Sequence, residues 1–283
     1  MKKLLLILVV WPWFPSCTSE ADLAIPETKP ELVIHGFLNP NDSIHKIQVT
    51  STFPSIGKVD DKPKFVNNAL VKLIHREDTV TLRFQLHPDT PFYFVDAKDF
   101  SLKHGERYEL YAEAVGFESV RAATTLPDTI VTDFDYELSR VPSGAQDSTF
   151  YLRLSWKELN DKQNYYCVRA GIIDSVLGVS GIRALTYPFF FNTALYEGNS
   201  VNGSLIISNR AQALLYAQTA VVSRTISISL LTVDSPYFLY HKSIEGYSII
   251  DPFKQPSNIF TNITNGKGVF CSYRETYYSF KLF

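Results

Sequence analysis

Residues 32–51 read LVIHGFLNPNDSIHKIQVTS, and this stretch decides the fold. Residues 32–38 form a short apolar run, and the cluster of Asn, Pro and Asp at 39–42 is typical of a tight turn. In residues 44–51 apolar side chains alternate with polar ones. Because successive side chains of a β-strand point to opposite faces, this alternation predicts a strand with one buried face. The stretch therefore predicts two strands joined by a turn.

The same pattern continues beyond this stretch. Turn residues separate further strand-like runs, at 69–75, 80–86, 108–114 and 119–125. Short strands at this close spacing are typical of a β-sandwich. We therefore expect a first sandwich domain at residues 31–126.

A second β-rich domain is expected at residues 127–283, with the sequence LPDT at 126–129 as the boundary. Strand-like runs recur in it, at 130–138, 150–156, 165–173, 204–208 and 225–233, and the tail ends in a last strand. Aromatic residues at helical spacing predict one short helix near 236–247, with Ser235 as its N-cap. The expected fold class is all-β, with two sandwich-like domains and one helix.

The composition is that of a globular protein, with 45% hydrophobic and 20% charged residues. Aromatic residues make up 14%, mainly Tyr and Phe, which suit half-buried strands. The formal net charge is −2, so the chain lacks the basic balance of proteins that bind nucleic acid. No nucleic-acid partner is expected.

The N-terminus has the features of a lipoprotein signal peptide at residues 1–16. Two lysines precede an apolar run at 4–10, which is far shorter than the roughly 20 residues of a membrane-spanning helix. A serine directly before Cys17 resembles the lipobox. We expect Cys17 to carry diacylglycerol and an amide-linked acyl chain such as palmitate, followed by a polar tether at 17–30. The alternative is ordinary secretion with a free cysteine.

The sequence holds no motif for catalysis or for a bound cofactor. His-Glu-x-x-His, the phosphate-binding glycine loop and Cys-x-x-Cys are absent from it. Asp133, Asp135 and Glu137 alternate on one predicted strand face, but they lack the glycine and the twelfth-position Glu of an EF-hand loop. We therefore expect a non-enzymatic protein without metal or cofactor.

Two cysteines besides Cys17 lie in strand-like runs, Cys167 and Cys271. In an oxidising compartment they form a disulfide if their Cα atoms come close, and otherwise they stay two buried thiols. The sequence leaves both alternatives open.

Phe189, Phe190 and Phe191 form an unusual run of three aromatic residues. Because strand residues alternate between faces, at least one of the three must point away from the core. Either the helix or the other domain covers it, or the cluster is an exposed patch for a partner protein.

Five positions resemble a bacterial O-glycosylation site, in which Asp is followed by Ser or Thr and then by an apolar residue: Ser43, Thr79, Thr129, Ser148 and Ser175, although the residue after Ser148 is Thr149. The same dipeptides are common in turns. Both interpretations predict that these residues are exposed.

Several stretches resemble the DUF4249 family of Bacteroidota lipoproteins. They include LVIHGFLNP at 32–40, HGERYEL at 104–110 and PSNIFTNITNGKGVF at 256–270. The resemblance covers nearly the whole mature chain in order, and its motifs are turn and core residues. These motifs indicate the family strongly, but they indicate little about any chemical activity.

The resemblance implies an outer-membrane lipoprotein of a kind often encoded beside a SusC-like, TonB-dependent β-barrel transporter, and by analogy one that docks on or near such a barrel. It also implies an immunoglobulin- or transthyretin-like first domain. Acidic residues soon after the expected lipidated cysteine, Glu20 and Asp22, resemble a diluted form of the surface-export signal of Bacteroidota lipoproteins, so we expect the chain to face the cell exterior rather than the periplasm. The expected role is a non-enzymatic accessory of the transporter. The alternatives are a stand-alone surface binding or adhesion module, and a structural subunit of an envelope secretion or assembly complex.

Overall fold

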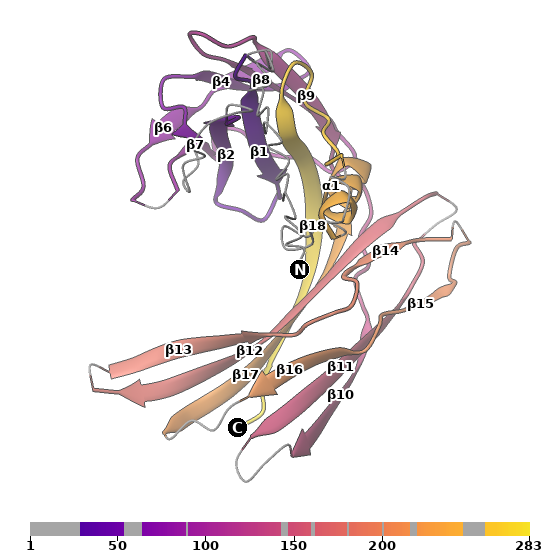
Figure 1. The fold of residues 1–283 in the computed structure, drawn as a ribbon. Coiled ribbons are helices and arrows are strands. Elements are labelled where there is room, and N and C mark those ends of the chain that lie inside the picture. Colours follow the sequence, from indigo (N-terminus) through magenta and orange to yellow (C-terminus); the bar gives the residue numbers. More distant parts are fainter. Residues whose placement is uncertain are drawn as a thin grey trace, which may run out of the picture.

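The structure, a computed structural model, describes residues 29–53, 64–88, 90–142, 147–159, 162–179, 181–199, 201–215, 220–245 and 258–283. Within these ranges it contains 18 β-strands and one α-helix, so the predicted all-β, sandwich-like fold is confirmed. The predicted signal peptide, Cys17 and the predicted tether up to residue 28 lie outside the described residues. The strands form two sandwiches, one above the other in Figure 1.

The first sandwich is built from β1 (Leu32–Leu38), β2 (Ile44–Ser51), β3 (Lys64–Phe65), β4 (Leu70–His75), β5 (Asp78–Thr81), β6 (Arg83–Gln85), β7 (Phe92–Asp96), β8 (Arg107–Glu113) and β9 (Val120–Thr125). One sheet has the order β5-β4-β8-β9, and the facing layer contains β1-β2-β7-β6. Burial in β1 follows its sequence. Leu32, Ile34 and Leu38 are buried in the core, whereas His35 and Phe37 lie half-buried on the opposite face.

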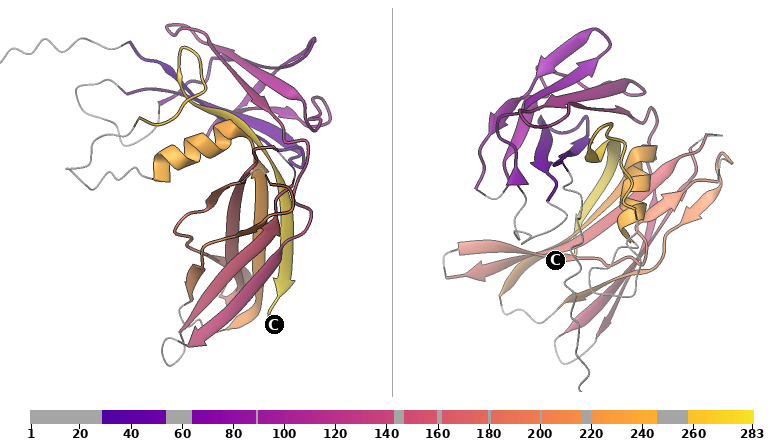
Figure 2. Two further views of the ribbon diagram at one scale, coloured as in Figure 1. Left: turned by 90° about the vertical axis from the view of Figure 1, so that its right-hand side faces the viewer. Right: turned by 45° about the horizontal axis from the view of Figure 1, so that its top comes forward.

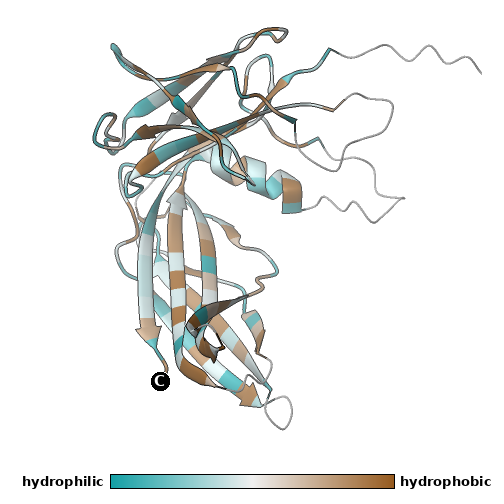
Figure 3. Cartoon of the chain, turned by 90° about the vertical axis from the view of Figure 1, so that its left-hand side faces the viewer, coloured by the Kyte–Doolittle hydropathy of each residue, from teal (hydrophilic) through white to brown (hydrophobic). Residues whose placement is uncertain are grey.

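The second sandwich is built from β10 (Asp135–Pro142), β11 (Ser148–Lys157), β12 (Tyr165–Gly178), β13 (Gly181–Pro188), β14 (Leu195–Glu197), β15 (Leu205–Ile207), β16 (Ala211–Leu215), β17 (Val221–Val233) and β18 (Lys267–Lys281). The layer β13-β12-β17-β18 faces a smaller sheet in which β10, β15 and β16 pair with β11. Hydrophobic and polar residues alternate along these strands in Figure 3. The inward-pointing residues form a core of their own around Trp156.

The strands differ from the sequence prediction at several places. The expected strand at 80–86 is divided at the buried Leu82, because β5 pairs with β4 in one sheet whereas β6 pairs with β7 in the other. The strand expected at 130–138 begins only at Asp135. The sequence analysis did not predict β3, β7, β13, β14 or β16. Most of these are short, and β14 and β16 pair with strands that are distant in sequence, whereas β13 pairs with its neighbour β12 across a tight turn.

Strand β18 belongs to both sandwiches. Its residues 267–272 pair in parallel with β1, and its residues 273–281 pair in antiparallel with β17. One continuous sheet therefore runs from β13 through β18 to β6. Residues 127–283 are therefore not wholly the second domain that the sequence predicts, because Ile263 and Phe270 lie in the core of the first sandwich.

The helix α1 (Ser235–Glu245) lies where the two sandwiches meet, as Figure 2 shows. Its N-cap is Asp234 rather than the predicted Ser235, because the Asp234 carboxylate accepts a hydrogen bond of 2.9 Å from the Tyr237 N–H. Tyr237 and Phe238 point into a third, small core at the junction, together with Leu231 and Val269. We call this group the junction core.

A buried polar cluster at the same place links three parts of the chain. Thr124 of β9 donates a hydrogen bond to the Asp234 carboxylate, and its hydroxyl lies 2.8 Å from that of Ser272 in β18. The Ser272 hydroxyl also donates to the Thr125 carbonyl at 3.1 Å. Burial raises the pKa of Asp234 to about 6, and these hydrogen bonds only partly oppose the shift.

The first prediction concerns the close approach of β1 and β18. Gly268→Ala should destabilise the protein by roughly 3 kcal/mol or more, because a left-handed backbone costs an L-residue about 1–2 kcal/mol and the added Cβ would collide with the Ile34 carbonyl oxygen. Gly203→Ala is the matched control, since Gly203 also has positive φ but an added Cβ meets nothing within 4 Å. Urea unfolding compares the two variants. Equal losses of unfolding free energy in the two variants would contradict the close approach of β1 and β18 at Gly268.

The second prediction concerns Asp234. Because its pKa is raised in the folded state, the folded protein binds this proton more tightly than the unfolded chain does. The free energy of unfolding should therefore fall by up to roughly 3 kcal/mol as the pH rises from about 4 to about 6. Asp234→Asn keeps an N-capping side chain without a titrating group, so it should flatten this pH profile.

Urea midpoints between pH 4 and 7 measure the effect, with Asp78→Asn on the exposed strand β5 as the control. An unchanged profile in Asp234→Asn would show that this carboxyl group is not the source of the dependence.

Candidate functional site

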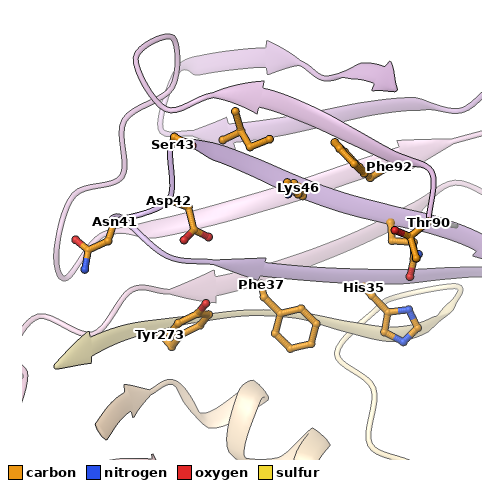
Figure 4. A pocket seen from close by; sticks show the side chains of 11 residues that line it. His35, Phe37, Asn41, Asp42, Ser43, Lys46, Thr90, Phe92 and Tyr273 are labelled. Carbon is orange, nitrogen blue, oxygen red and sulfur yellow. The ribbon is translucent and has the colours of Figure 1, made fainter. Parts of the chain in front are cut away.

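An open groove of 660 Å³ lies on the outer face of the first sandwich, opposite its core. Its lining comes from β1, β2, β7, β18 and the β1–β2 turn, and includes His35, Phe37, Asp42, Lys46, Phe92 and Tyr273. In Figure 4, Tyr273, Phe37 and His35 lie in a row along β18 and β1. Alternation along β1 puts His35 and Phe37 on this face, because their neighbours in the strand fill the core.

The helix fixes one side of the groove. The His35 Nε2 atom lies 3.1 Å from the Tyr240 hydroxyl, within hydrogen-bond distance. The ring of Phe37 packs edge-on against Tyr237, with 6.0 Å between the ring centroids. Burial lowers the pKa of His35, so this imidazole is held in its neutral form near pH 7. The aromatic side of the groove is therefore preorganised by contacts with α1.

The β1–β2 turn fixes one end of the groove. Asn39 is buried, and its amide donates a hydrogen bond of 3.0 Å to the Asp42 carboxylate. The Asn39 side-chain oxygen accepts from the Asn41 N–H at 3.2 Å. Burial also raises the pKa of Asp42 above its ordinary value. The turn therefore presents a carboxylate that is held in place by its own backbone and amide neighbours.

The groove combines aromatic rings with charged groups. The Lys46 ammonium lies 5.0 Å from the centre of the Phe92 ring, at a distance typical of a cation–π contact. Aromatic faces next to a few placed polar groups are typical of sites that bind ligands with both apolar and hydrogen-bonding surfaces. Among the described residues, no group of three His, Cys, Asp or Glu side chains is placed to hold a metal ion. The arrangement therefore suits the binding of a ligand or a partner protein.

The two cysteines are free thiols in the structure, so of the two alternatives the unpaired one is observed. The Tyr237 hydroxyl donates to the Cys167 Sγ atom at 3.8 Å, and the Cys271 thiol donates to the Gly36 carbonyl at 3.7 Å. Both lie in the junction core, and burial raises the pKa of each thiol. Thiols of this kind react slowly, and here they act as small core residues.

The three phenylalanines have different environments. Phe189 is 5% exposed and packs in the core of the second sandwich, and Phe191 packs against that core from its edge. Phe190 is 65% exposed, and its backbone pairs with Gln212 of β16. The run is therefore not one exposed patch, and only its middle residue is available to a partner.

The expected exposure of the O-glycosylation candidates holds at three of the five positions. Ser43, Thr79 and Thr129 are exposed, and Ser43 stands at the rim of the groove. Ser148 is buried and its hydroxyl accepts a hydrogen bond from Arg140, so the expectation was wrong there. Ser175 is half-buried in the middle of β12, not in a turn. Glycosylation of the exposed positions stays a prediction.

The alternating acidic residues belong to a solvated face. Glu137 stands opposite Arg153 on β11, and the Tyr278 hydroxyl lies 3.3 Å from Asp133.

In the part of the chain that the structure describes, no helix is long and apolar enough to cross a membrane.

Sequence reasoning missed the groove as a site. The alternation in β1 was sufficient to predict that His35 and Phe37 share a face. Tyr273 could not have been added to them, because it is 238 positions away from His35 and only the pairing of β18 with β1 brings the two together.

A family model described as a domain of unknown function, DUF4249, matches residues 18–279. The match starts one residue after Cys17 and extends through both sandwiches. No curated protein matches the chain.

The third prediction separates the roles of two adjacent aromatic residues. Phe189→Ala should lower the free energy of unfolding by roughly 3–5 kcal/mol, because it leaves a cavity in the second core. Phe190→Ala should change it by no more than about 0.5 kcal/mol, because this ring is exposed. Urea denaturation measures both. A large loss in Phe190→Ala would mean that this ring is packed in the folded protein.

Proposed function

The chain belongs to the DUF4249 family, and from this premise we propose that it is an outer-membrane lipoprotein that docks on a β-barrel transporter. In this proposal Cys17 carries the lipid, the protein faces the cell exterior, and it acts without catalysis as an accessory of a TonB-dependent transporter. The family's own description assigns no function.

The observation that carries the anchor is the position of Cys17. A charged start, a short apolar run and a serine before Cys17 make a lipoprotein signal, and the family match begins at residue 18. The agreement of these two boundaries supports a mature chain that starts at Cys17. A diacylglycerol group together with an amide-linked acyl chain holds a protein on a membrane stably, whereas one chain binds only marginally.

The fold supports a defined orientation on the membrane. Strands β1 and β18 are parallel, so both start at the end of the first sandwich where the tether joins β1. Residues 273–281 of β18 then continue past β1 into the second sandwich, for about 30 Å at the usual rise of a strand. With a lipid on Cys17, the first sandwich would lie next to the membrane and the second would project from it.

The groove favours recognition of a partner or ligand. Its aromatic and charged groups are fixed by the helix and by the β1–β2 turn, so little freedom would be lost on binding. The same groove would serve the second candidate function, a stand-alone surface binder of a peptide or glycan. The two candidates differ in whether a transporter barrel accompanies the protein.

The fourth prediction tests anchor and docking together. Cys17→Ala should remove the protein from the outer-membrane fraction and abolish palmitate labelling, whereas the neighbouring change Ser19→Ala should do neither. A tagged wild-type chain, solubilised from outer membranes in detergent, should co-purify with a stoichiometric β-barrel of the TonB-dependent type.

Each part of this test has its own contrary result. If Cys17→Ala stayed in the outer membrane with unchanged palmitate labelling, Cys17 would not be the residue that carries the lipid. Recovery of the lipoprotein alone would rule out stable docking and favour the stand-alone binder, and recovery of several envelope subunits would favour a structural role in a larger complex.

A further inference from the structure

Strand β13 is the free edge of the long sheet that runs through both sandwiches. One side of β13 pairs with β12 over its whole length, from Gly178 opposite Gly181 to Gly171 opposite Pro188. Among the described residues, no strand pairs with its other side, and the nearest bridge lies beyond its end at Phe190. The edge therefore consists of an eight-residue strand with one unpaired side.

The backbone groups that face this free edge can be identified. The Phe189 N–H donates to Ala170 of β12, whereas the Phe190 N–H points the other way and donates to Gln212 of β16. Backbone groups alternate in direction along a strand, so the odd-numbered residues of β13 bond to β12. The N–H and C=O groups of Ile182, Ala184 and Thr186 therefore point away from the sheet.

This edge lacks the features that usually protect one. Proteins block exposed edges with prolines, bulges or several charges. Residues 182–186 contain no proline, and Arg183 is their only charge. The edge residues Ile182, Ala184 and Thr186 are all exposed. Such an edge binds another extended strand, because only a second backbone satisfies a row of N–H and C=O groups.

Exposed apolar groups stand at both ends of the edge. At the hairpin tip, Leu177 and Ile182 lie opposite each other and are 58% and 66% exposed. At the other end, Phe190 is 65% exposed. In an antiparallel pair of two identical strands, the tip of one copy lies beside the far end of the other. Two copies of β13 would therefore place each hairpin tip beside the Pro188 end of the other copy, on the side that leads to Phe190.

We propose that a second copy of this chain pairs with β13 in antiparallel, about a two-fold axis at Ala184. Ile182 then stands opposite Thr186 of the partner subunit, and Arg183 opposite Leu185 of the partner subunit, so the two Arg183 side chains are diagonal neighbours and do not stand directly opposite each other. The three outward residues of each copy form about six backbone hydrogen bonds across the axis. The long sheet continues from one molecule into the next, with the same surface used on both, as a two-fold interface requires.

Disulfide trapping tests the register of this pairing. All variants carry Cys17→Ser, and the remaining native thiols are buried. In the proposed dimer the two Ala184 Cα atoms are about 5.5 Å apart, within the disulfide range, so Ala184→Cys should yield a covalent dimer under mild oxidation. The two copies of Thr186 are offset by roughly 13 Å along the strands, so Thr186→Cys alone should yield none.

A mixture of Ile182→Cys and Thr186→Cys chains should also cross-link, because these positions face each other only between copies. Cross-linking that is equal in Ala184→Cys and Thr186→Cys would show random collision and overturn the proposed pairing.

A proline variant tests the edge without a cross-link. Ala184→Pro removes one outward N–H that β12 does not use, and proline is tolerated on edge strands, so the monomer should keep its fold and its urea midpoint. Sedimentation velocity at rising concentration should show a dimer for the Cys17→Ser chain and its loss in Ala184→Pro. If the Cys17→Ser chain stays monomeric at every concentration, a second copy is not the occupant of this edge, and the proposal fails.

Discussion

Two sets of hydrogen bonds along one strand hold the molecule together. The first part of β18 bonds to β1 and the rest bonds to β17, so neither sandwich has a complete sheet without it. The pairing with β1 brings the two backbones so close at Gly268 that a Cβ has no room there. Because the strand is continuous, a change at its start acts on both halves.

The junction core and the polar cluster of Thr124, Asp234 and Ser272 stabilise the same place from its two sides. Asp234 caps the helix while it bonds to two strands, so helix, first sandwich and second sandwich share one carboxyl group. The helix in turn contacts His35 and Phe37. The shape of the groove therefore depends on the junction, although no groove residue belongs to the polar cluster.

The groove and the free edge lie on opposite parts of one sheet. The groove covers β18, β1, β2 and β7, and the free edge is β13 at the far end of the same strand order. In the proposed orientation the groove would be near the membrane and the edge away from it. A molecule arranged in this way could bind one partner through side chains and a second copy through its backbone, without competition between the two.

The sequence by itself determined the strands with clean alternation, such as β1 and β2, and the position of the helix, because each depends on neighbours in the chain. Only the tertiary structure decided that Ser148 is buried, that Cys167 and Cys271 stay apart as thiols, and that Tyr273 joins His35 in one groove. These outcomes depend on which distant strands pair. Strand β18 pairs with β1 across more than 200 residues of sequence and with β17 in the other sandwich. Local periodicity carries no information on such pairing.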